Sequence, residues 1–233
     1  MKKVVVIGGA VIDLFLYPHE KMILHDSNPG YMKRSFGGVG RNIAENLVRL
    51  NVDTTLITAL GVDPWGKEIY DHAIKLGMCI NTVDVNETPL YISVMKEDGE
   101  DLVSVALMDE VLSITKESLS SRSPYIREAD LLVLDTNLSS ESLNYLFETY
   151  DKPIYLDVIS TQKATKISAH FHQIHTLKMN LIEAESLTGM TYQDEADLVH
   201  IGQFFIERGV REVFITLGSK GAFFMQENKH QKK

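Results

Sequence analysis

The sequence predicts a doubly wound α/β fold, in which helices cover both faces of a mostly parallel sheet. Short apolar runs without period-two alternation are typical of buried parallel strands, and they lie at 4–7, 55–58, 131–134, 154–156 and 213–216. Helical patterns alternate with these runs, at 42–50, 65–76, 140–150, 181–187 and 195–208. This alternation of strand and helix buries a parallel sheet between two helical layers.

Two regions, 13–36 and 89–107, break that rhythm. They carry short strand patterns at 14–17, 32–36, 90–95 and 102–106, and the residues at 97–100 suit a hairpin turn between the last two. We expect them to form a small β sheet attached to one α/β domain that spans 1–233. Such a sheet beside the strand ends would act as a lid that excludes water from a reacting phosphoryl group.

Composition narrows the possible partners. The 233 residues carry a formal charge of −9, which argues against nucleic acid and anionic membranes. No stretch approaches the roughly 18 apolar residues that span a bilayer. The single cysteine, Cys79, can form no intrachain disulfide, and we expect it to be a small buried residue in a cytoplasmic protein. Residues 227–233 are polar and basic, and we expect them to be disordered.

The first candidate site follows the strand at 4–7, where Gly8 and Gly9 precede Asp13. Ligands of open α/β sheets bind at the carboxyl ends of strands, and glycine lets the backbone approach them closely. The Asp13 carboxylate could accept hydrogen bonds from two vicinal sugar hydroxyls. An aspartate after a strand is also a common turn or cap residue, so this signal alone leaves both interpretations open.

The second candidate is a glycine-rich turn that contains Gly37 and Gly38 and leads through Asn42 into a helix. It exposes the first N–H groups of the helix, while the Asn42 amide can both donate and accept hydrogen bonds. The turn matches neither the Walker sequence nor the dinucleotide fingerprint. It suits a polar ligand, with a plain loop-to-helix junction as the alternative.

Two further candidates lie toward the carboxyl end. Asn180 and Glu183 are placed at a helix start, where they either form a capping box or face a cleft with Glu183 beside the water shell of Mg²⁺. The strand ending at Thr216 turns at Gly218, where a hydroxyl and a bare backbone could contact a nucleotide. On its own, the segment at 216–218 is simply a β-turn.

In this order, the four segments resemble the signatures of the ribokinase family, also called the phosphofructokinase B type, over essentially the whole chain. Residues 37–42 resemble its first signature, the pair at 180 and 183 its magnesium and phosphate motif, and 216–221 its nucleotide-side turn. The resemblance implies a ribokinase-like fold with a β lid, and a kinase that uses ATP and Mg²⁺. Because lid sheets in this family often pair between subunits, it also implies a homodimer through the lid.

Within the family, the strings at 26–30, 37–44, 174–178 and 183–189 look like the pseudouridine kinase branch. That likeness implies transfer of the γ-phosphoryl group of ATP to the ribose 5′-hydroxyl of pseudouridine. Kinases of another ribonucleoside or sugar, and a non-catalytic nucleoside-binding protein, are the alternatives. By the same resemblance, the sugar is assigned to Asp13, Gly37, Gly38 and Asn42, the ATP phosphates to Asn180, Mg²⁺ to Glu183, and the nucleotide to Thr216 and Gly218.

The sequence departs from the family pattern at two points. Met179 stands where the family usually has proline. The family's Gly-Ala-Gly-Asp run, which supplies an anion hole and the aspartate that accepts the hydroxyl proton, does not occur in these 233 residues. No catalytic base is therefore assigned, and we expect the chain to be an incomplete version of a longer kinase that lacks the carboxyl-terminal part of the family fold.

Overall fold

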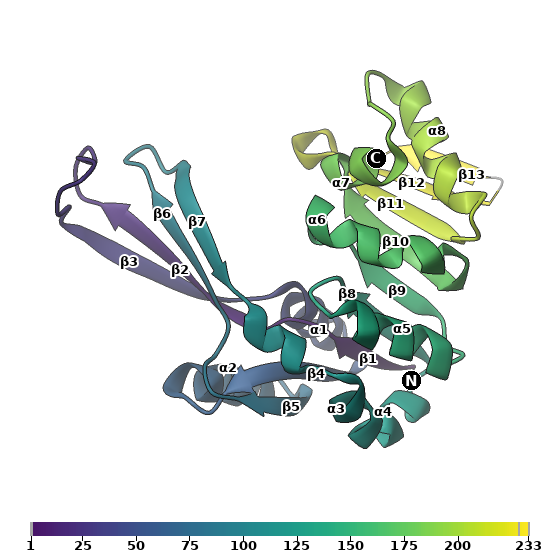
Figure 1. Ribbon diagram of the computed structural model, residues 1–233, viewed down its shortest axis with the longest axis horizontal. Helices are drawn as coiled ribbons and strands as arrows, with labels where there is room; N and C mark the ends of the chain where they lie inside the picture. The colour runs from purple at the N-terminus through teal and green to yellow at the C-terminus, as the bar shows by residue number, and fades with distance from the viewer. Residues whose placement is uncertain (1, 228, 233) are drawn as a thin grey trace.

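The computed structural model describes residues 2–227 and 229–232, which form two β sheets and their covering helices (Figure 1). The strands are β1 Lys3–Ile7, β2 Val11–Pro18, β3 Gly30–Gly37, β4 Asp53–Gly61, β5 Cys79–Val85, β6 Leu90–Met95, β7 Asp101–Leu107, β8 Leu131–Asp135, β9 Ile154–Asp157, β10 Ile174–Asn180, β11 Glu212–Thr216, β12 Ala222–Gln226 and β13 Lys229–Lys232. The α-helices are α1 Val39–Arg49, α2 Pro64–Lys75, α3 Lys116–Ser121, α4 Ser123–Glu128, α5 Ser140–Thr149, α6 Thr161–Ala164, α7 Leu181–Thr188 and α8 Glu195–Ile206. Three 3₁₀ segments complete the described elements: η1 Asp109–Ser113, η2 Thr165–Gln173 and η3 Gly218–Lys220.

The large sheet has the order β13-β12-β11-β10-β9-β8-β1-β4-β5 within the described residues. Pairing is parallel from β5 through β11 and antiparallel from β11 to β12 and from β12 to β13. Parallel neighbours need crossover connections, and the intervening helices supply them. The predicted doubly wound α/β fold is confirmed.

The residues of β1 are buried on both faces of the large sheet. Val5 and Ile7 pack in one hydrophobic cluster, while Val4 and Val6 pack in another on the opposite face. The first cluster includes side chains of α5 and α8, and the second includes Ala44 of α1. Consecutive apolar residues are therefore all buried, which accounts for the unalternating pattern of the strand.

The small sheet has the order β3-β2-β6-β7 and projects away from the large sheet (Figure 1). The outer pairs are antiparallel, whereas the central strands β2 and β6 run parallel. In the connection between β6 and β7, Gly99 adopts φ 85°, which suits glycine at the predicted turn. The four predicted strand patterns thus meet in one sheet, although the parallel central pair was not anticipated.

Two predictions about single segments are wrong. Residues 229–232 form β13, paired along β12, instead of a disordered tail. The open edge of β12 offers backbone groups that a polar segment can satisfy as well as an apolar one. Cys79 is exposed because it begins β5, the edge strand of the large sheet. Residues 228 and 233 of the predicted tail lie outside the described residues, within which no helix is long and apolar enough to cross a membrane.

Candidate functional site

Asp13 and Gly37 lie in the small sheet beyond the carboxyl end of β1, whereas Asn180 and Thr216 end strands of the large sheet. The turn after β1 leads to Asp13, β10 ends at Asn180 and β11 ends at Thr216, and these three strands run parallel. Two strands, β8 and β9, separate β1 from β10. At about 4.8 Å per strand, β1 and β10 are therefore roughly 14 Å apart along the edge.

Asp13 and Gly37 are brought into direct proximity by the pairing of β2 with β3. Val11 pairs with Gly37 and Asp13 with Ser35, so Asp13 and Gly37 share one face of the small sheet. A Cβ atom added at Gly37 would clash with the Asp13 carboxylate. Only glycine leaves room for this carboxylate against the backbone.

Gly38 and Gly40 let the start of α1 rest on the turn after β1. Gly38 precedes the helix with φ 90°, and a Cβ atom there would clash with the carbonyl oxygen of Gly9. A Cβ atom on Gly40 would lie 2.9 Å from the Cα atom of Gly8. In addition, the backbone N–H of Arg41 donates to the Gly9 carbonyl at 3.1 Å. The glycines therefore permit backbone-to-backbone packing of the two loops.

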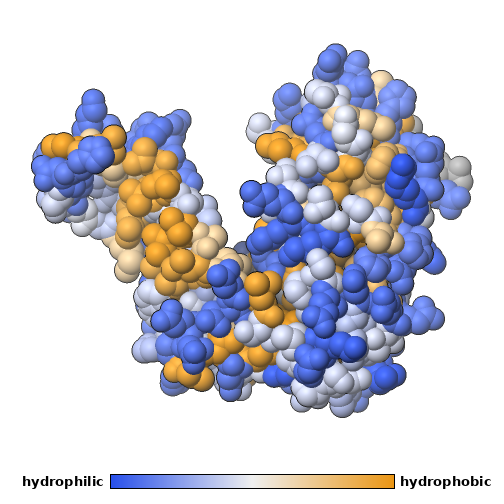
Figure 2. Space-filling view, viewed as in Figure 1, coloured by the Kyte–Doolittle hydropathy of each residue, from blue (hydrophilic) through white to orange (hydrophobic). Residues whose placement is uncertain are grey.

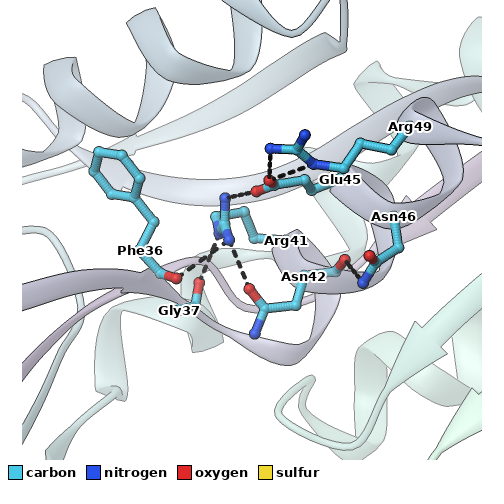
Figure 3. A network of polar contacts seen from close by, with 7 residues as sticks. All are labelled: Phe36, Gly37, Arg41, Asn42, Glu45, Asn46 and Arg49. Carbon is cyan, nitrogen blue, oxygen red and sulfur yellow. Dashed lines mark hydrogen bonds and ion pairs between the residues drawn. The ribbon is translucent and has the colours of Figure 1, made fainter.

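Arg41 orients the Asn42 side chain (Figure 3). Its buried guanidinium donates to the carbonyl oxygens of Phe36 and Gly37 at 3.2 Å each and to Asn42 Oδ1 at 2.7 Å. It also pairs with Glu45 at 2.5 Å. Because Arg41 occupies Oδ1, the Asn42 Nδ2 group is left as the donor, and it points away from the network in Figure 3.

Asp13 and Asn42 therefore combine one anionic acceptor with one amide donor. Burial raises the pKa of Asp13, and the nearby Arg41 guanidinium opposes that rise. A carboxylate at Asp13 can accept hydrogen bonds from hydroxyl groups, while Asn42 Nδ2 can donate to a hydroxyl oxygen. This combination suits a ligand that carries adjacent hydroxyls.

At the carboxyl end of β10, Asn180 and Glu183 form a capping box at the start of α7. Asn180 Oδ1 accepts from the Glu183 N–H at 2.8 Å, and Glu183 Oε2 accepts from the Asn180 N–H at 2.8 Å. Burial raises the pKa of Glu183, which is 4% exposed, while the Asn180 N–H and Lys178 oppose that rise and Asp157 adds to it. The capping interpretation is confirmed. Of the two Glu183 carboxylate oxygens, only Oε2 accepts a hydrogen bond in the capping box.

Thr216 and Gly218 follow on the neighbouring strand. Thr216 pairs with Asn180 in the register of β10 and β11, and its hydroxyl lies 3.4 Å from the Met179 carbonyl oxygen. Gly218 is exposed with φ 61°, and a Cβ atom there would meet open space. Glycine is favoured there by backbone conformation, and not by close packing within the chain.

The residues present fit Mg²⁺ held mainly by nucleotide phosphates. Within the described chain, no group of three or more His, Cys, Asp or Glu side chains could hold a metal ion. Mg²⁺ commonly binds through one or two carboxylates, waters and substrate phosphates, so it needs no all-protein cage. The hard oxygen donor of Glu183 is of the type that such an ion takes.

Three residues of this region were missed by the sequence analysis: Arg41, Asp135 and Tyr91. Arg41 lies inside the recognised glycine-rich turn, but its buried hydrogen bonds are visible only in the fold. Asp135 ends an apolar strand, which is the same signal that pointed to Asp13. Tyr91 pairs with Asp13 across β2 and β6, and the unanticipated parallel pairing hid this relationship.

The comparisons with known proteins agree with this geometry. The model of the pfkB family of carbohydrate kinases matches residues 1–232. The chain is 34% identical over 225 residues to a pseudouridine kinase from Escherichia coli, covering 95% of this chain and 72% of that enzyme.

Solved structures show the same fold. A carbohydrate kinase from Agrobacterium tumefaciens superimposes with a TM-score of 0.87 at 28% identity, covering 99% of this chain and 75% of that one. A ribokinase from Arabidopsis thaliana, solved with ribose and ATP, superimposes with a TM-score of 0.80 at 20% identity, covering 100% of this chain and 77% of that one. The family match over nearly every residue, together with the ribokinase-like fold, shows that the chain belongs to the pfkB family of carbohydrate kinases.

Proposed function

We propose that this kinase-family chain binds pseudouridine at the acceptor side and Mg²⁺–ATP at the nucleotide side, in the arrangement for phosphorylation of the ribose 5′-hydroxyl. The observation that carries the proposal is the Asp13 carboxylate lodged against Gly37, with the Asn42 amide oriented by Arg41 beside it. Asp13, Gly37, Gly38 and Asn42 would hold the sugar. Two vicinal ribose hydroxyls would donate to Asp13 and accept from Asn42.

The nucleotide would lie along the ends of β10 and β11. Asn180 would contact the phosphates, Thr216 and Gly218 the rest of the nucleotide, and Glu183 the water shell of Mg²⁺. Bound Mg²⁺ would supply positive charge to the phosphate oxygens. In the transfer, a bond forms between the ribose 5′-oxygen and the γ-phosphorus, and the bond to the β-γ bridging oxygen breaks to release ADP.

The hydroxyl proton leaves to a base that we do not assign to any residue of this chain, because the sequence has no Gly-Ala-Gly-Asp run. Binding is therefore the property to measure first, with ADP release as a separate readout.

Tyr91 favours a nucleoside over a free sugar. Its Cα atom pairs with that of Asp13 in the parallel register, so both side chains lie on the same face of the small sheet. Phe15 and Tyr17 follow Asp13 on that face at two-residue steps. Aromatic faces can stack on a nucleobase, whereas ribose alone has no ring system to stack.

Calorimetry with pseudouridine, uridine and ribose tests the proposal. We expect pseudouridine to bind. Asp13→Asn should weaken this binding at least about tenfold, equivalent to ~1.4 kcal/mol. Asp53→Asn, at the amino end of β4, should leave the binding unchanged. Tyr91→Ala should weaken the two nucleosides but not ribose.

Equal binding by wild type and Asp13→Asn would contradict the site. Tight binding without ADP release from ATP would instead identify a nucleoside-binding protein built on the kinase fold.

We also propose that the chain forms a homodimer through the small sheet. The face opposite Asp13 carries exposed apolar side chains on β7, including Val103, Val105 and Leu107, each at least 51% exposed. Figure 2 shows an apolar patch over β6 and β7. A second copy of the same face would cover them, as self-complementary patches do in two-fold dimers.

A further inference from the structure

One buried carboxylate, that of Asp135, joins three segments at the carboxyl edge of the large sheet. Asp135 ends β8 beside β1 and is 1% exposed. Its Oδ2 atom accepts hydrogen bonds from the N–H groups of Gly9 at 2.9 Å and Gly40 at 3.1 Å. Its Oδ1 atom accepts from the Asn137 N–H at 2.9 Å. The turn after β1, the first turn of α1 and the loop after β8 are thereby tied to one side chain.

The surrounding glycines are required by this arrangement. A Cβ atom at Gly8 would clash with Asp135 Oδ2, and one at Gly9 would lie 3.1 Å from Asn137 Nδ2. From the helix side, a Cβ atom at Gly40 would lie 2.9 Å from the Cα atom of Gly8. The chain therefore has no side chain between the two loops, and the carboxylate takes the place that such a side chain would fill.

Packing alone does not account for an acid at this position. Among the described residues, no Lys, Arg or His forms an ion pair with Asp135, and its hydrogen-bond partners are backbone N–H groups. A buried carboxylate is expensive unless its charge is stabilised, and an apolar residue of similar size would avoid that penalty. The N–H groups at the start of α1 supply part of the stabilisation because they carry the positive end of the helix dipole.

The two loops that Asp135 joins carry the acceptor side of the proposed site. The turn at Gly8 and Gly9 continues directly into β2 and Asp13, and the first turn of α1 carries Asn42. We propose that Asp135 is a positioning residue, whose ionised carboxylate holds these two loops at the spacing that lets Asp13 and Asn42 bind one sugar. The inference rests on the proposed function for its ligand, but its structural part can be tested without ligand.

Several charged groups face Asp135 from neighbouring elements. Burial raises its pKa to about 6, the N–H groups of Gly9, Asn137 and Gly40 oppose the rise, and Asp157 of β9 adds to it. From the helical side, Lys166 of η2 interacts with Asp135 and donates to the Thr136 and Leu138 carbonyls at 3.1 and 2.8 Å. Lys163 of α6 donates to Asn137 Oδ1 at 2.6 Å. Both lysines thus bind the segment 136–138 that directly follows Asp135.

Protonation would open the connection between the loops. A neutral carboxyl group carries a hydrogen on one oxygen, and that oxygen then faces N–H donors with a donor of its own. At least one of the three hydrogen bonds is lost. Affinity for the sugar should therefore weaken as pH falls through about 6.

The isosteric variant Asp135→Asn separates this role from packing. Its amide places an NH₂ group where a carboxylate oxygen accepted N–H bonds, at almost unchanged volume. Pseudouridine binding is measured by calorimetry between pH 5 and 8, and amide hydrogen exchange at Gly9 and Gly40 is measured by NMR in the ligand-free chain. We expect a dissociation constant at least about tenfold weaker at pH 7.5, loss of the wild-type weakening below pH 6, and faster exchange at both glycines.

Asp63→Asn is the matched control. Asp63 also bridges two segments through three hydrogen bonds, to the Gly66 N–H and to the N–H and hydroxyl of Thr88. It caps α2, and none of these bonds involves the turn at Gly8 and Gly9 or the start of α1. This variant should lower stability without changing the dissociation constant or the exchange at Gly9 and Gly40.

The outcomes are distinct. Wild-type affinity, pH profile and glycine exchange in Asp135→Asn would overturn the inference. If the wild-type chain binds none of pseudouridine, uridine and ribose, the proposed function fails, while unchanged exchange in the variant would still overturn the role of Asp135. If the variant does not fold, the test uses the wild type alone. After correction for the intrinsic effect of pH, amide exchange at Gly9 and Gly40 must become faster relative to exchange at Gly66 below pH 6. A constant ratio of these exchange rates would refute the inference.

Discussion

The carboxylate of Asp13 occupies the space beside Gly37 in which any larger residue would place its Cβ atom. The contact joins two neighbouring strands, β2 and β3, that are separated in the sequence by an eleven-residue connection between Pro18 and Gly30. The side chain is half-buried and can still swing outward, so a methyl group at position 37 would displace the carboxylate before it unfolded the sheet.

Gly37→Ala should therefore reduce acceptor binding more than it reduces stability. We expect the dissociation constant for pseudouridine to rise at least about tenfold, equivalent to ~1.4 kcal/mol, while thermal unfolding shifts by only a few degrees. Gly99→Ala is the control: its φ of 85° makes alanine unfavourable at this hairpin turn, so the variant should lose stability without losing affinity. Unchanged affinity in Gly37→Ala would show that the Asp13 carboxylate does not hold the ligand.

Glu183→Gln tests whether the capping box also serves the metal. Glutamine keeps an oxygen that can accept from the Asn180 N–H, so the loss of stability should stay within about 1 kcal/mol. The gain in ATP affinity on adding Mg²⁺, measured by calorimetry with and without EDTA, should shrink because the anionic oxygen is gone.

The chain offers a matched control in the capping box of α8. There, Asp197 Oδ2 accepts from the N–H groups of Gln193 and Asp194 at 2.8 and 3.1 Å. Asp197→Asn removes the same kind of charge from the same kind of helix start, and it should leave the Mg²⁺ effect intact. An equal Mg²⁺ effect in wild type and Glu183→Gln would confine Glu183 to capping.

The sequence predicted the strands of the large sheet best where both faces are buried. Val4 to Ile7 read as one apolar run because the residues of β1 pack alternately into two cores. Strand β5 escaped prediction because it is an edge strand whose residues are mostly half-exposed. Strand β13 escaped for a related reason, since its backbone pairing with β12 does not depend on apolar side chains.

The sequence predicted the part of the candidate site that is a glycine-rich turn. Gly37 and Gly38 stood out because they precede a helical run. The role of Asp135 could not be read in the same way, because it depends on long-range contacts with Gly9 and Gly40, 126 and 95 residues away in the sequence. Contacts that arise from the order of strands in a sheet leave no pattern in the local sequence.

The exposed apolar face of β7 predicts a dimer that one charge should disrupt. Val105→Asp places a carboxylate in the middle of this face, and burying it between two copies would be unfavourable. We expect light scattering to report a dimer for the wild type and a monomer for the variant. Val62→Asp is the control, since Val62 is 75% exposed but lies outside the small sheet. A wild-type chain that stays monomeric at every concentration would exclude this interface.

The pKa of Asp135 predicts an unusual contribution to stability. A carboxyl group whose pKa rises from 3.8 to about 6 on folding favours the neutral form by about 3 kcal/mol. Above pH 3.8 the unfolded chain releases this proton while the folded chain retains it, so the contribution of Asp135 to the free energy of unfolding falls as pH rises toward 6. The difference in free energy of unfolding between wild type and Asp135→Asn should therefore decrease by up to about 3 kcal/mol from pH 4 to pH 7.

Urea unfolding at a series of pH values measures this difference, and Asp63 should give a slope of the opposite sign. Burial would raise its pKa, but hydrogen bonds from Gly66 and Thr88 outweigh burial and lower it. Its contribution to stability is therefore present above pH 3.8 and is lost on further acidification. The free energy of unfolding of the wild type should rise relative to that of Asp63→Asn as pH rises from about 2 to 5. Slopes of the same sign for the two variants would contradict a raised pKa at Asp135, because burial raises that pKa whereas hydrogen bonds lower the pKa of Asp63.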